Sequence, residues 1–187
     1  MLKEDRLLVS LVGLPGCGKS TVGRQLARRL QLPFFDSDQR IEQRLGCSIR
    51  EYFEREGEDC FRDLETAVLD ELTQESQGVL STGGGAVLRP ANRDFLHARG
   101  RVFYLKSHPD ELFRRLKHDS KRPLLQVADP LARLRELFDV RDALYREVAH
   151  FVVETGRPSV AGLVNTIAMQ LELEGFLPAA RDFGATA

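Results

Sequence analysis

The 187-residue sequence lacks any apolar run that approaches the ~20 residues of a membrane-spanning helix. Its charged first six residues lead directly into an apolar segment, which is not the pattern of a secretory signal peptide. The three cysteines are odd in number and have no Cys-x-x-Cys spacing, so neither a disulfide framework nor a zinc site is indicated. We therefore expect a cytoplasmic protein with no membrane partner.

An excess of charge of one sign is also missing. The formal net charge is −1 at pH 7, which argues against a general nucleic-acid partner. The four histidines follow no metal-ligand pattern, and we assign none of them to metal binding or to base catalysis. The length and the 42% hydrophobic content suit one domain with a core over a central sheet.

Residues 13–20 match the phosphate-loop pattern G-x-x-x-x-G-K-[ST]. The match lies between an apolar run, which predicts a buried strand, and a segment with helical periodicity. Glycines let backbone N–H groups turn toward a polyphosphate, and the following helix adds free N–H groups and the positive end of its dipole. The sequence predicts that Lys19 reaches the β and γ phosphates of a nucleoside triphosphate and that Ser20 holds Mg²⁺.

Two further points concern the same loop. A dinucleotide-binding fingerprint fails, because the third glycine of G-x-G-x-x-G is missing and a lysine follows Gly18. Cys17 has two interpretations: a small residue that fills the loop, or a thiol that the positive potential of the loop makes oxidisable.

Strand-like and helix-like segments alternate along the chain, which predicts an α/β fold with a parallel sheet covered by helices on both faces. Strands are expected at residues 7–12, 34–36, 78–82, 102–105 and 151–153. Helices are expected at residues 19–30, 90–99, 109–116, 131–149 and 159–173, with two or three more within 39–74. Residues 117–130 show no clear period and suit a mobile lid. The tail from Glu174 is expected to fray.

Carboxylates follow the second expected strand in the run Asp36-Ser37-Asp38. Ligands of open α/β sheets bind outside the carboxyl ends of the strands, so one carboxylate can help to hold Mg²⁺ while the other orients or deprotonates an alcohol. The alternative is that Asp38 only caps the helix that follows.

Three glycines, Gly83 to Gly85, follow the third expected strand. Because they cost backbone entropy, they indicate that another group comes very close to the main chain; a tight turn is the alternative. The arginines Arg62, Arg122 and Arg141 suit anion binding, or are plain surface charge.

Taken together, these motifs closely resemble the shikimate kinase family over nearly the whole chain, from the first strand to about Leu173. The resemblance is carried by the loop with Lys19-Ser20-Thr21, Asp36-Ser37-Asp38, Phe61-Arg62-Asp63-Leu64-Glu65, Ser81-Thr82-Gly83-Gly84-Gly85, Lys121-Arg122-Pro123-Leu124-Leu125, and Arg141 just ahead of Leu144-Tyr145. Where many related phosphate-loop enzymes carry a Walker-B aspartate, this chain has only the threonine and glycines after its third strand.

The resemblance implies a three-layer α/β/α fold with a five-stranded parallel sheet in the order 2-3-1-4-5, of the nucleoside-monophosphate-kinase type, with a mobile lid. It implies one kinase domain over residues 1–173, a substrate-binding helical insertion at about 39–75, a lid at about 117–130 and a flexible tail at 174–187. Family members transfer the γ-phosphoryl group of ATP to the 3-hydroxyl of shikimate, a polyhydroxylated ring acid of the aromatic amino-acid pathway. We expect ATP and shikimate as substrates, Mg²⁺ as cofactor and a monomer.

The resemblance also implies a role for each site residue. The catalytic residues are Asp38, Lys19 and Arg122. The ATP site comprises Gly16, Cys17, Gly18, Lys19, Ser20, Thr21, Arg115, Arg122 and Arg157. The acceptor site comprises Asp38, Arg62, Gly84 and Arg141, of which the two arginines hold the carboxylate. Mg²⁺ is held by Ser20 with Asp36 near it.

Two other functions stay open at this point. One is a kinase for another small acceptor, such as gluconate or a nucleoside monophosphate, which the arginines and the triple glycine disfavour. The other is a ligand sensor without chemistry, which the retention of Lys19, Ser20, Asp36 and Asp38 disfavours. A GTPase switch is disfavoured because no N-K-x-D signature is present.

Overall fold

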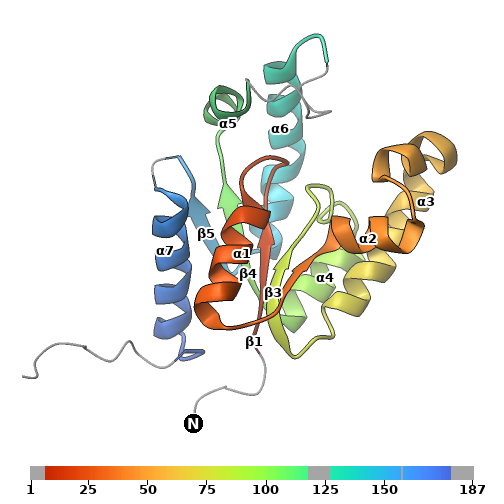
Figure 1. Ribbon diagram of the computed structural model, residues 1–187. Helices are drawn as coiled ribbons and strands as arrows, with labels where there is room; N and C mark the ends of the chain where they lie inside the picture. The colour runs from red at the N-terminus through yellow and green to blue at the C-terminus, as the bar shows by residue number, and fades with distance from the viewer. Residues whose placement is uncertain (1–6, 118–126, 157, 178–187) are drawn as a thin grey trace, which may run out of the picture.

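A computed structural model of the chain describes residues 7–117, 127–156 and 158–177, and in these residues five parallel strands form one sheet in the order β2-β3-β1-β4-β5 (Figure 1). This is the strand order that the resemblance implies. The strands are β1 (Leu7–Val12), β2 (Phe34–Asp36), β3 (Gln77–Ser81), β4 (Arg101–Lys106) and β5 (Phe151–Glu154).

The central strand β1 shows why the sequence forms a three-layer structure. All six of its residues are buried, and it pairs in parallel with β3 on one side and with β4 on the other. Leu7, Val9 and Leu11 pack into one apolar cluster, whereas Leu8 and Val12 pack into a second. Because successive side chains of a strand point to opposite faces, the apolar run provides two cores and needs helices on both faces.

The helices supply those two layers (Figure 1). One face of the sheet is covered by α1 (Lys19–Leu30) and α7 (Val160–Leu173). The other face is covered by α3 (Ile49–Leu72), α4 (Pro90–Arg99), α5 (Pro109–Leu116) and α6 (Pro130–Val148). None of the helices in the described part of the chain is long and apolar enough to cross a bilayer.

The expected insertion consists of α2 (Ser37–Leu45) and α3, which project beyond the sheet on the right of Figure 1. Ser48 caps α3 as expected, in a capping box: the Glu51 N–H donates to Ser48 Oγ at 3.2 Å, and the Ser48 N–H donates to Glu51 Oε2 at 2.8 Å. Gly57 breaks α3 into two parts. The insertion thus has the two or three helical pieces that the sequence predicts.

Some boundaries differ from the expectation. Helix α2 begins at Ser37, two residues before the predicted insertion, because Asp36 caps it. Phe176 belongs to the core beside α1 and α7 rather than to a frayed tail, because its side chain is 9% exposed and its N–H donates to the Leu171 carbonyl. Most of the expected lid, and with it Arg122, lies outside the described residues, as does Arg157.

The break in α3 allows a test of backbone strain. Gly57 has φ 83° and ψ 174°, a conformation nearly restricted to glycine, whereas Gly46 has φ 68° and ψ 11° in the ordinary left-handed region. A methyl group would meet no atom within 4 Å at either position. We therefore expect Gly57→Ala to lower the free energy of unfolding by about 2 kcal/mol and Gly46→Ala by about 1 kcal/mol, measured by urea denaturation. Equal losses would show that α3 accommodates the alanine by straightening.

Candidate active site

The phosphate loop connects β1 directly to α1. Gly13, Gly16 and Gly18 all have positive φ, at 149°, 82° and 99°, a region that side-chain-bearing residues rarely adopt. Gly18 is the N-cap of α1 and has no side chain to cap the helix, and the first turn of α1 contains no acidic residue. The positive end of the helix is therefore free to interact with an anion.

The amine of Lys19 lies on the loop itself. Its Nζ donates to the carbonyl oxygens of Gly13 and Leu14, both at 2.9 Å, and lies 3.8 Å from Cys17 Sγ. These partners are uncharged, so the positive charge of Lys19 stays available for phosphate. Cys17 is 1% exposed, which agrees with its interpretation as a residue that fills the loop.

Three side-chain oxygens meet beside the loop. Ser20 Oγ donates to Asp36 Oδ2 at 2.7 Å and lies 3.1 Å from Ser81 Oγ. Asp36 and Ser81 are paired residues on the neighbouring strands β2 and β3. Sequence reasoning assigned Ser20 and Asp36 to the metal and missed Ser81, although its position at the end of a buried strand was a usable signal. Hydroxyl and carboxylate oxygens of this kind suit Mg²⁺, which keeps waters and phosphate oxygens as its other ligands.

The N-cap of α2 is Asp36 and not Asp38, so the alternative role considered for Asp38 is wrong. Asp36 Oδ1 accepts hydrogen bonds from the N–H groups of Asp38 and Gln39, at 3.1 and 3.2 Å. Asp36 precedes the first helical residue and therefore has the extended backbone that a cap needs, whereas Asp38 lies inside the first turn. The Asp38 carboxylate is left free of the helix end.

The partly buried Asp38 carboxylate faces charges of both signs. Its pKa is raised from 3.8 to about 6, mainly by burial and next by the nearby charge of Asp36, against the charge of Lys19, which lowers it. Within the described residues it accepts no side-chain hydrogen bond. A carboxylate with a pKa near neutrality and an unused acceptor oxygen suits proton transfer from an alcohol.

The triple glycine (residues 83–85) begins a turn, in which the Ala86 N–H donates to the Gly83 carbonyl at 3.1 Å, and it is also a point of close approach. None of the three has a positive φ, so the turn itself does not require glycine. A Cβ atom on any of them would overlap a neighbouring group of the site. The nearest atoms to such a Cβ would be Asp38 Oδ1 at 2.6 Å for Gly83, Pro15 Cδ at 2.7 Å for Gly84 and Arg62 Nη1 at 2.5 Å for Gly85. The first of the two interpretations of these glycines is therefore confirmed, and the glycines bring a carboxylate, the phosphate loop and an arginine together.

Arg62 is held in place by two glutamates on its own helix. Its Nη1 donates to Glu65 Oε2 at 2.7 Å, and its Nε and Nη2 donate to Glu58 Oε1 at 3.2 and 3.1 Å. Glu65 is 1% exposed, and burial raises its pKa although the charge of Arg62 lowers it. Glu58 is exposed, so a ligand carboxylate can replace it on the guanidinium. Sequence reasoning gave Glu65 no role, although its spacing of three residues from Arg62 on a helix was a signal.

Arg141, on α6, completes the positive side of the site. Among the described residues it forms no ion pair, yet its charge lowers the pKa values of both Glu65 and Tyr145, which burial raises. Tyr145 in turn donates a hydrogen bond to the carbonyl of Gly84. Arg141 is thus a cation beside the triple glycine that no carboxylate of the described chain neutralises.

Several of the predicted site residues line one cavity of about 360 Å³ at the carboxyl ends of β1, β2 and β3. Its lining comprises Pro15, Gly16, Gly18, Lys19, Ser20, Thr21, Asp36, Asp38, Thr82 and Gly84. Arg62 and Arg141 are not in this lining: Arg62 lies beside Gly85, next to the lining residue Gly84, and Arg141 interacts with Glu65 and Tyr145. Arg115 lies apart from this lining, where its Nη2 donates to Ser107 Oγ at 3.0 Å beyond the end of β4.

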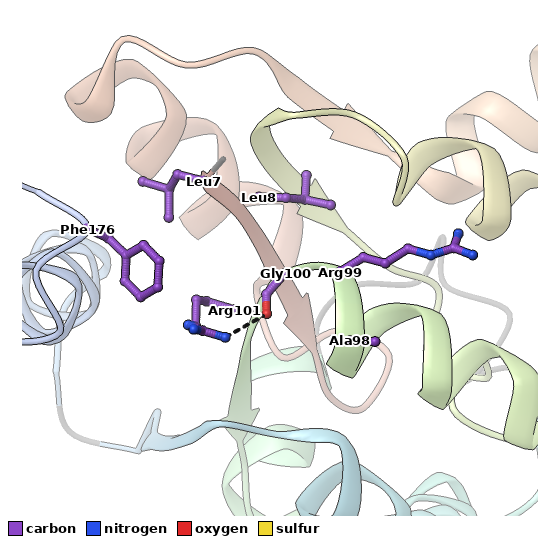
Figure 2. Close-up of a pocket in the computed structure, with 7 residues that line it drawn as sticks. All are labelled: Leu7, Leu8, Ala98, Arg99, Gly100, Arg101 and Phe176. Atoms are coloured by element: carbon purple, nitrogen blue, oxygen red, sulfur yellow. Dashed lines mark hydrogen bonds between the residues drawn. The ribbon is translucent and has the colours of Figure 1, made fainter. Parts of the chain in front are cut away.

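A smaller cavity, of about 160 Å³, lies at the other end of the strands (Figure 2). Leu7, Leu8, Arg101 and Phe176 are among its lining residues, and Arg101 donates to the Gly100 carbonyl at 3.4 Å (Figure 2). It adjoins the amino ends of β1 and β4, whereas ligands of open α/β sheets bind at the carboxyl ends. The cavity beside the phosphate loop is therefore the candidate active site.

Comparison with known proteins agrees with this geometry. The family model described as shikimate kinase matches residues 15–172. A curated shikimate kinase of Ralstonia nicotianae is 59% identical over 169 residues, covering 90% of this chain and 89% of that protein. A curated shikimate kinase of Paracidovorax citrulli is also 59% identical, over 180 residues, covering 95% of this chain and 98% of that protein.

A solved structure gives the same result. The shikimate kinase from Acinetobacter baumannii in complex with shikimate superposes with a TM-score of 0.85 and 46% sequence identity, covering 93% of this chain and 97% of that chain. The family model covers most of the chain, and the relatives are far above the identity at which only a fold is shared. This chain belongs to the shikimate kinase family.

Proposed function

We propose that this chain transfers the γ-phosphoryl group of ATP to the 3-hydroxyl of shikimate, giving shikimate 3-phosphate and ADP. The observation that carries the proposal is the position of Asp38. The charge of Lys19 lowers the pKa of its carboxylate. The same carboxylate lies beside Gly83, next to Glu65, which is the partner of Arg62. An acceptor between these groups has phosphate on one side and a basic carboxylate for its hydroxyl.

The phosphate half of the site is formed by the loop and by α1. Its free N–H groups and the Lys19 amine bind the β and γ phosphates, and Lys19 exchanges two carbonyl partners for phosphate oxygens. Ser20 and Asp36 are the residues that would hold Mg²⁺, which neutralises developing phosphate charge when bound. In this proposal Arg122 adds a further positive charge to the phosphates, and Arg115 and Arg157 contact the adenine side.

The acceptor half is formed by the insertion, the triple glycine and α6. Arg62 and Arg141 bind the carboxylate of the substrate, and the Gly84 main chain contacts the ring. As the bond between the 3-oxygen and the γ-phosphorus forms, the bond from that phosphorus to the β–γ bridging oxygen breaks. The hydroxyl proton passes to Asp38, whose pKa of about 6 leaves it mostly ionised at pH 7 and able to accept that proton.

Acceptor preference is the direct test of this function. In a coupled assay with ATP, we expect turnover with shikimate and values of kcat/KM at least about 10²-fold lower with gluconate or a nucleoside monophosphate, because the proposed site pairs two arginines for a ring carboxylate with Asp38 for a ring hydroxyl. A preference for either competitor would favour another small-molecule kinase. Binding of shikimate without ATP turnover would favour the sensor interpretation.

Asp38→Asn tests the proton acceptor. We expect kcat to fall about 10²-fold or more while the KM for ATP stays within about twofold, because asparagine keeps the shape but cannot take a proton. For the wild-type protein, kcat/KM should decline as the pH falls below about 6, where Asp38 becomes protonated, and the variant should lose this dependence. A near-normal kcat in the variant would remove Asp38 from the mechanism.

Arg141→Ala tests the carboxylate site with little disturbance of the fold, since no described carboxylate loses an ion pair. We expect the KM for shikimate to rise about tenfold or more, with a smaller change in kcat and an unchanged KM for ATP. Arg133→Ala is the matched control on the same helix, because Arg133 is exposed and, among the described residues, pairs with Glu136 alone. A KM for shikimate that is equal in both variants would refute the role of Arg141.

Arg62→Ala should raise the same KM but should also destabilise the protein. Removing this guanidinium leaves the buried Glu65 without its 2.7 Å partner, which costs on the order of 3 kcal/mol. Arg141→Ala is therefore the cleaner of the two kinetic tests.

A further inference from the structure

The triple glycine needs support from outside itself. Glycine has more backbone freedom than any other residue, and residues 83–85 belong to neither a strand nor a helix. Gly84 lines the active-site cavity, and its N–H and that of Gly85 donate to no acceptor within the described residues. The direction of these two N–H groups therefore depends on the contacts that fix the peptide planes on either side of Gly84.

Two turn hydrogen bonds hold the carbonyls on either side of Gly84: the Ala86 N–H donates to Gly83 at 3.1 Å and the Leu88 N–H donates to Gly85 at 3.0 Å. Two buried side chains hold two further polar groups of the segment. Ser37 Oγ accepts a hydrogen bond from the Gly83 N–H at 3.0 Å, and the Tyr145 hydroxyl donates to the Gly84 carbonyl oxygen at 2.5 Å. Ser37 is 0% exposed and Tyr145 is 1% exposed, so water does not compete effectively for either bond. The Tyr145 bond fixes the plane of the peptide between Gly84 and Gly85.

Tyr145 is also linked to the substrate-binding arginine. It follows Arg141 by four residues on α6, a spacing that puts both side chains on one face of the helix. The charge of Arg141 lowers the pKa of Tyr145, but burial has the larger effect and raises it, so the hydroxyl keeps its proton and remains a donor. One face of α6 thus carries both the guanidinium of Arg141 and the Tyr145 hydroxyl, which donates to the Gly84 carbonyl.

We propose that Tyr145 is a positioning residue for the acceptor, whose hydroxyl holds the Gly84 peptide so that the neighbouring N–H groups face the substrate. This inference rests on the proposed function, because it assigns Gly84 to the shikimate side of the cavity. Without the Tyr145 hydroxyl, the Gly84 carbonyl loses its donor, and the peptide between Gly84 and Gly85 can tilt although the Gly83 and Gly85 carbonyls keep their turn hydrogen bonds. Shikimate binding should suffer, and ATP binding, which depends on the loop and α1, should not.

The neighbouring Tyr104 offers a matched control. The two tyrosine rings pack with centroids 4.9 Å apart, and both residues are almost fully buried in the same apolar cluster. The Tyr104 hydroxyl donates to Asp142 Oδ1 at 2.8 Å, and Asp142 also accepts from Arg146, so this bond does not involve the triple glycine. Tyr145→Phe and Tyr104→Phe each remove one buried hydroxyl and should cost similar stability, about 1 kcal/mol.

The experiment compares the two variants in steady-state kinetics and by NMR without substrate. For Tyr145→Phe we expect a rise of about tenfold in the KM for shikimate, with the KM for ATP within about twofold, and for Tyr104→Phe we expect neither to change by more than about twofold. The ¹³C resonance of the Gly84 carbonyl should shift in Tyr145→Phe and stay in place in Tyr104→Phe.

Each outcome decides the proposal. An unmoved Gly84 resonance in Tyr145→Phe would overturn it whatever the substrate is, and so would equal increases in the KM values for shikimate and ATP, which indicate general loosening. If the wild-type protein instead phosphorylates another acceptor, the proposed function fails separately. The Gly84 resonance and the KM for that acceptor then still test Tyr145.

Discussion

The site depends on a stretch of main chain that carries no side chains. At the end of β3, the positions of three glycines allow Asp38, the Pro15 ring and Arg62 each to approach within 3 Å of the point where a Cβ would stand. These groups come from three different parts of the chain: α2, the phosphate loop and α3. A larger residue would displace the Asp38 carboxylate at Gly83, the phosphate loop at Gly84 or the Arg62 guanidinium at Gly85, and in-line transfer requires the phosphate half and the acceptor half of the cavity to be in contact.

The charges that meet at this point are only partly compensated, which lowers the stability of the unliganded protein. Asp38 has a pKa of about 6 in the folded protein against 3.8 in an unstructured chain, so the folded state binds its proton more tightly. This favours folding below about pH 4 and is lost as the pH rises through 6, leaving a relative cost of about 3 kcal/mol at neutral pH. In the proposed function the substrates would supply what is missing, because phosphate and carboxylate would bring negative charge to Lys19 and Arg141 while the acceptor hydroxyl would give Asp38 a hydrogen-bond donor.

Sequence patterns predicted the elements that depend on local signals. The buried run before Gly13, the caps at Ser48 and the proline at the start of α5 are local, and the strands and helices there follow the prediction closely. Some contacts between distant segments were out of reach even with the resemblance: the hydroxyl of Ser81 beside Ser20, and the hydroxyl of Tyr145 on Gly84, join residues 61 positions apart. The cap role was considered only as an alternative for Asp38 and belongs to Asp36, because both residues suit an N-cap by type and only the backbone shows where α2 begins.

The two halves of the cavity have different structural origins. The phosphate half consists of strand ends and the start of α1, whose positions are fixed by pairing within the sheet and by the buried side chains of β1. The acceptor half is added by the insertion and by α6, which supply Arg62, Glu65, Arg141 and Tyr145 from outside the sheet. Side chains on these helices can change without disturbing the phosphate loop, so acceptor specificity can vary on a constant phosphoryl-transfer scaffold. The glycine segment is where the two halves touch, and its hold by Ser37 from α2 and Tyr145 from α6 couples the choice of acceptor to the position of the reacting hydroxyl.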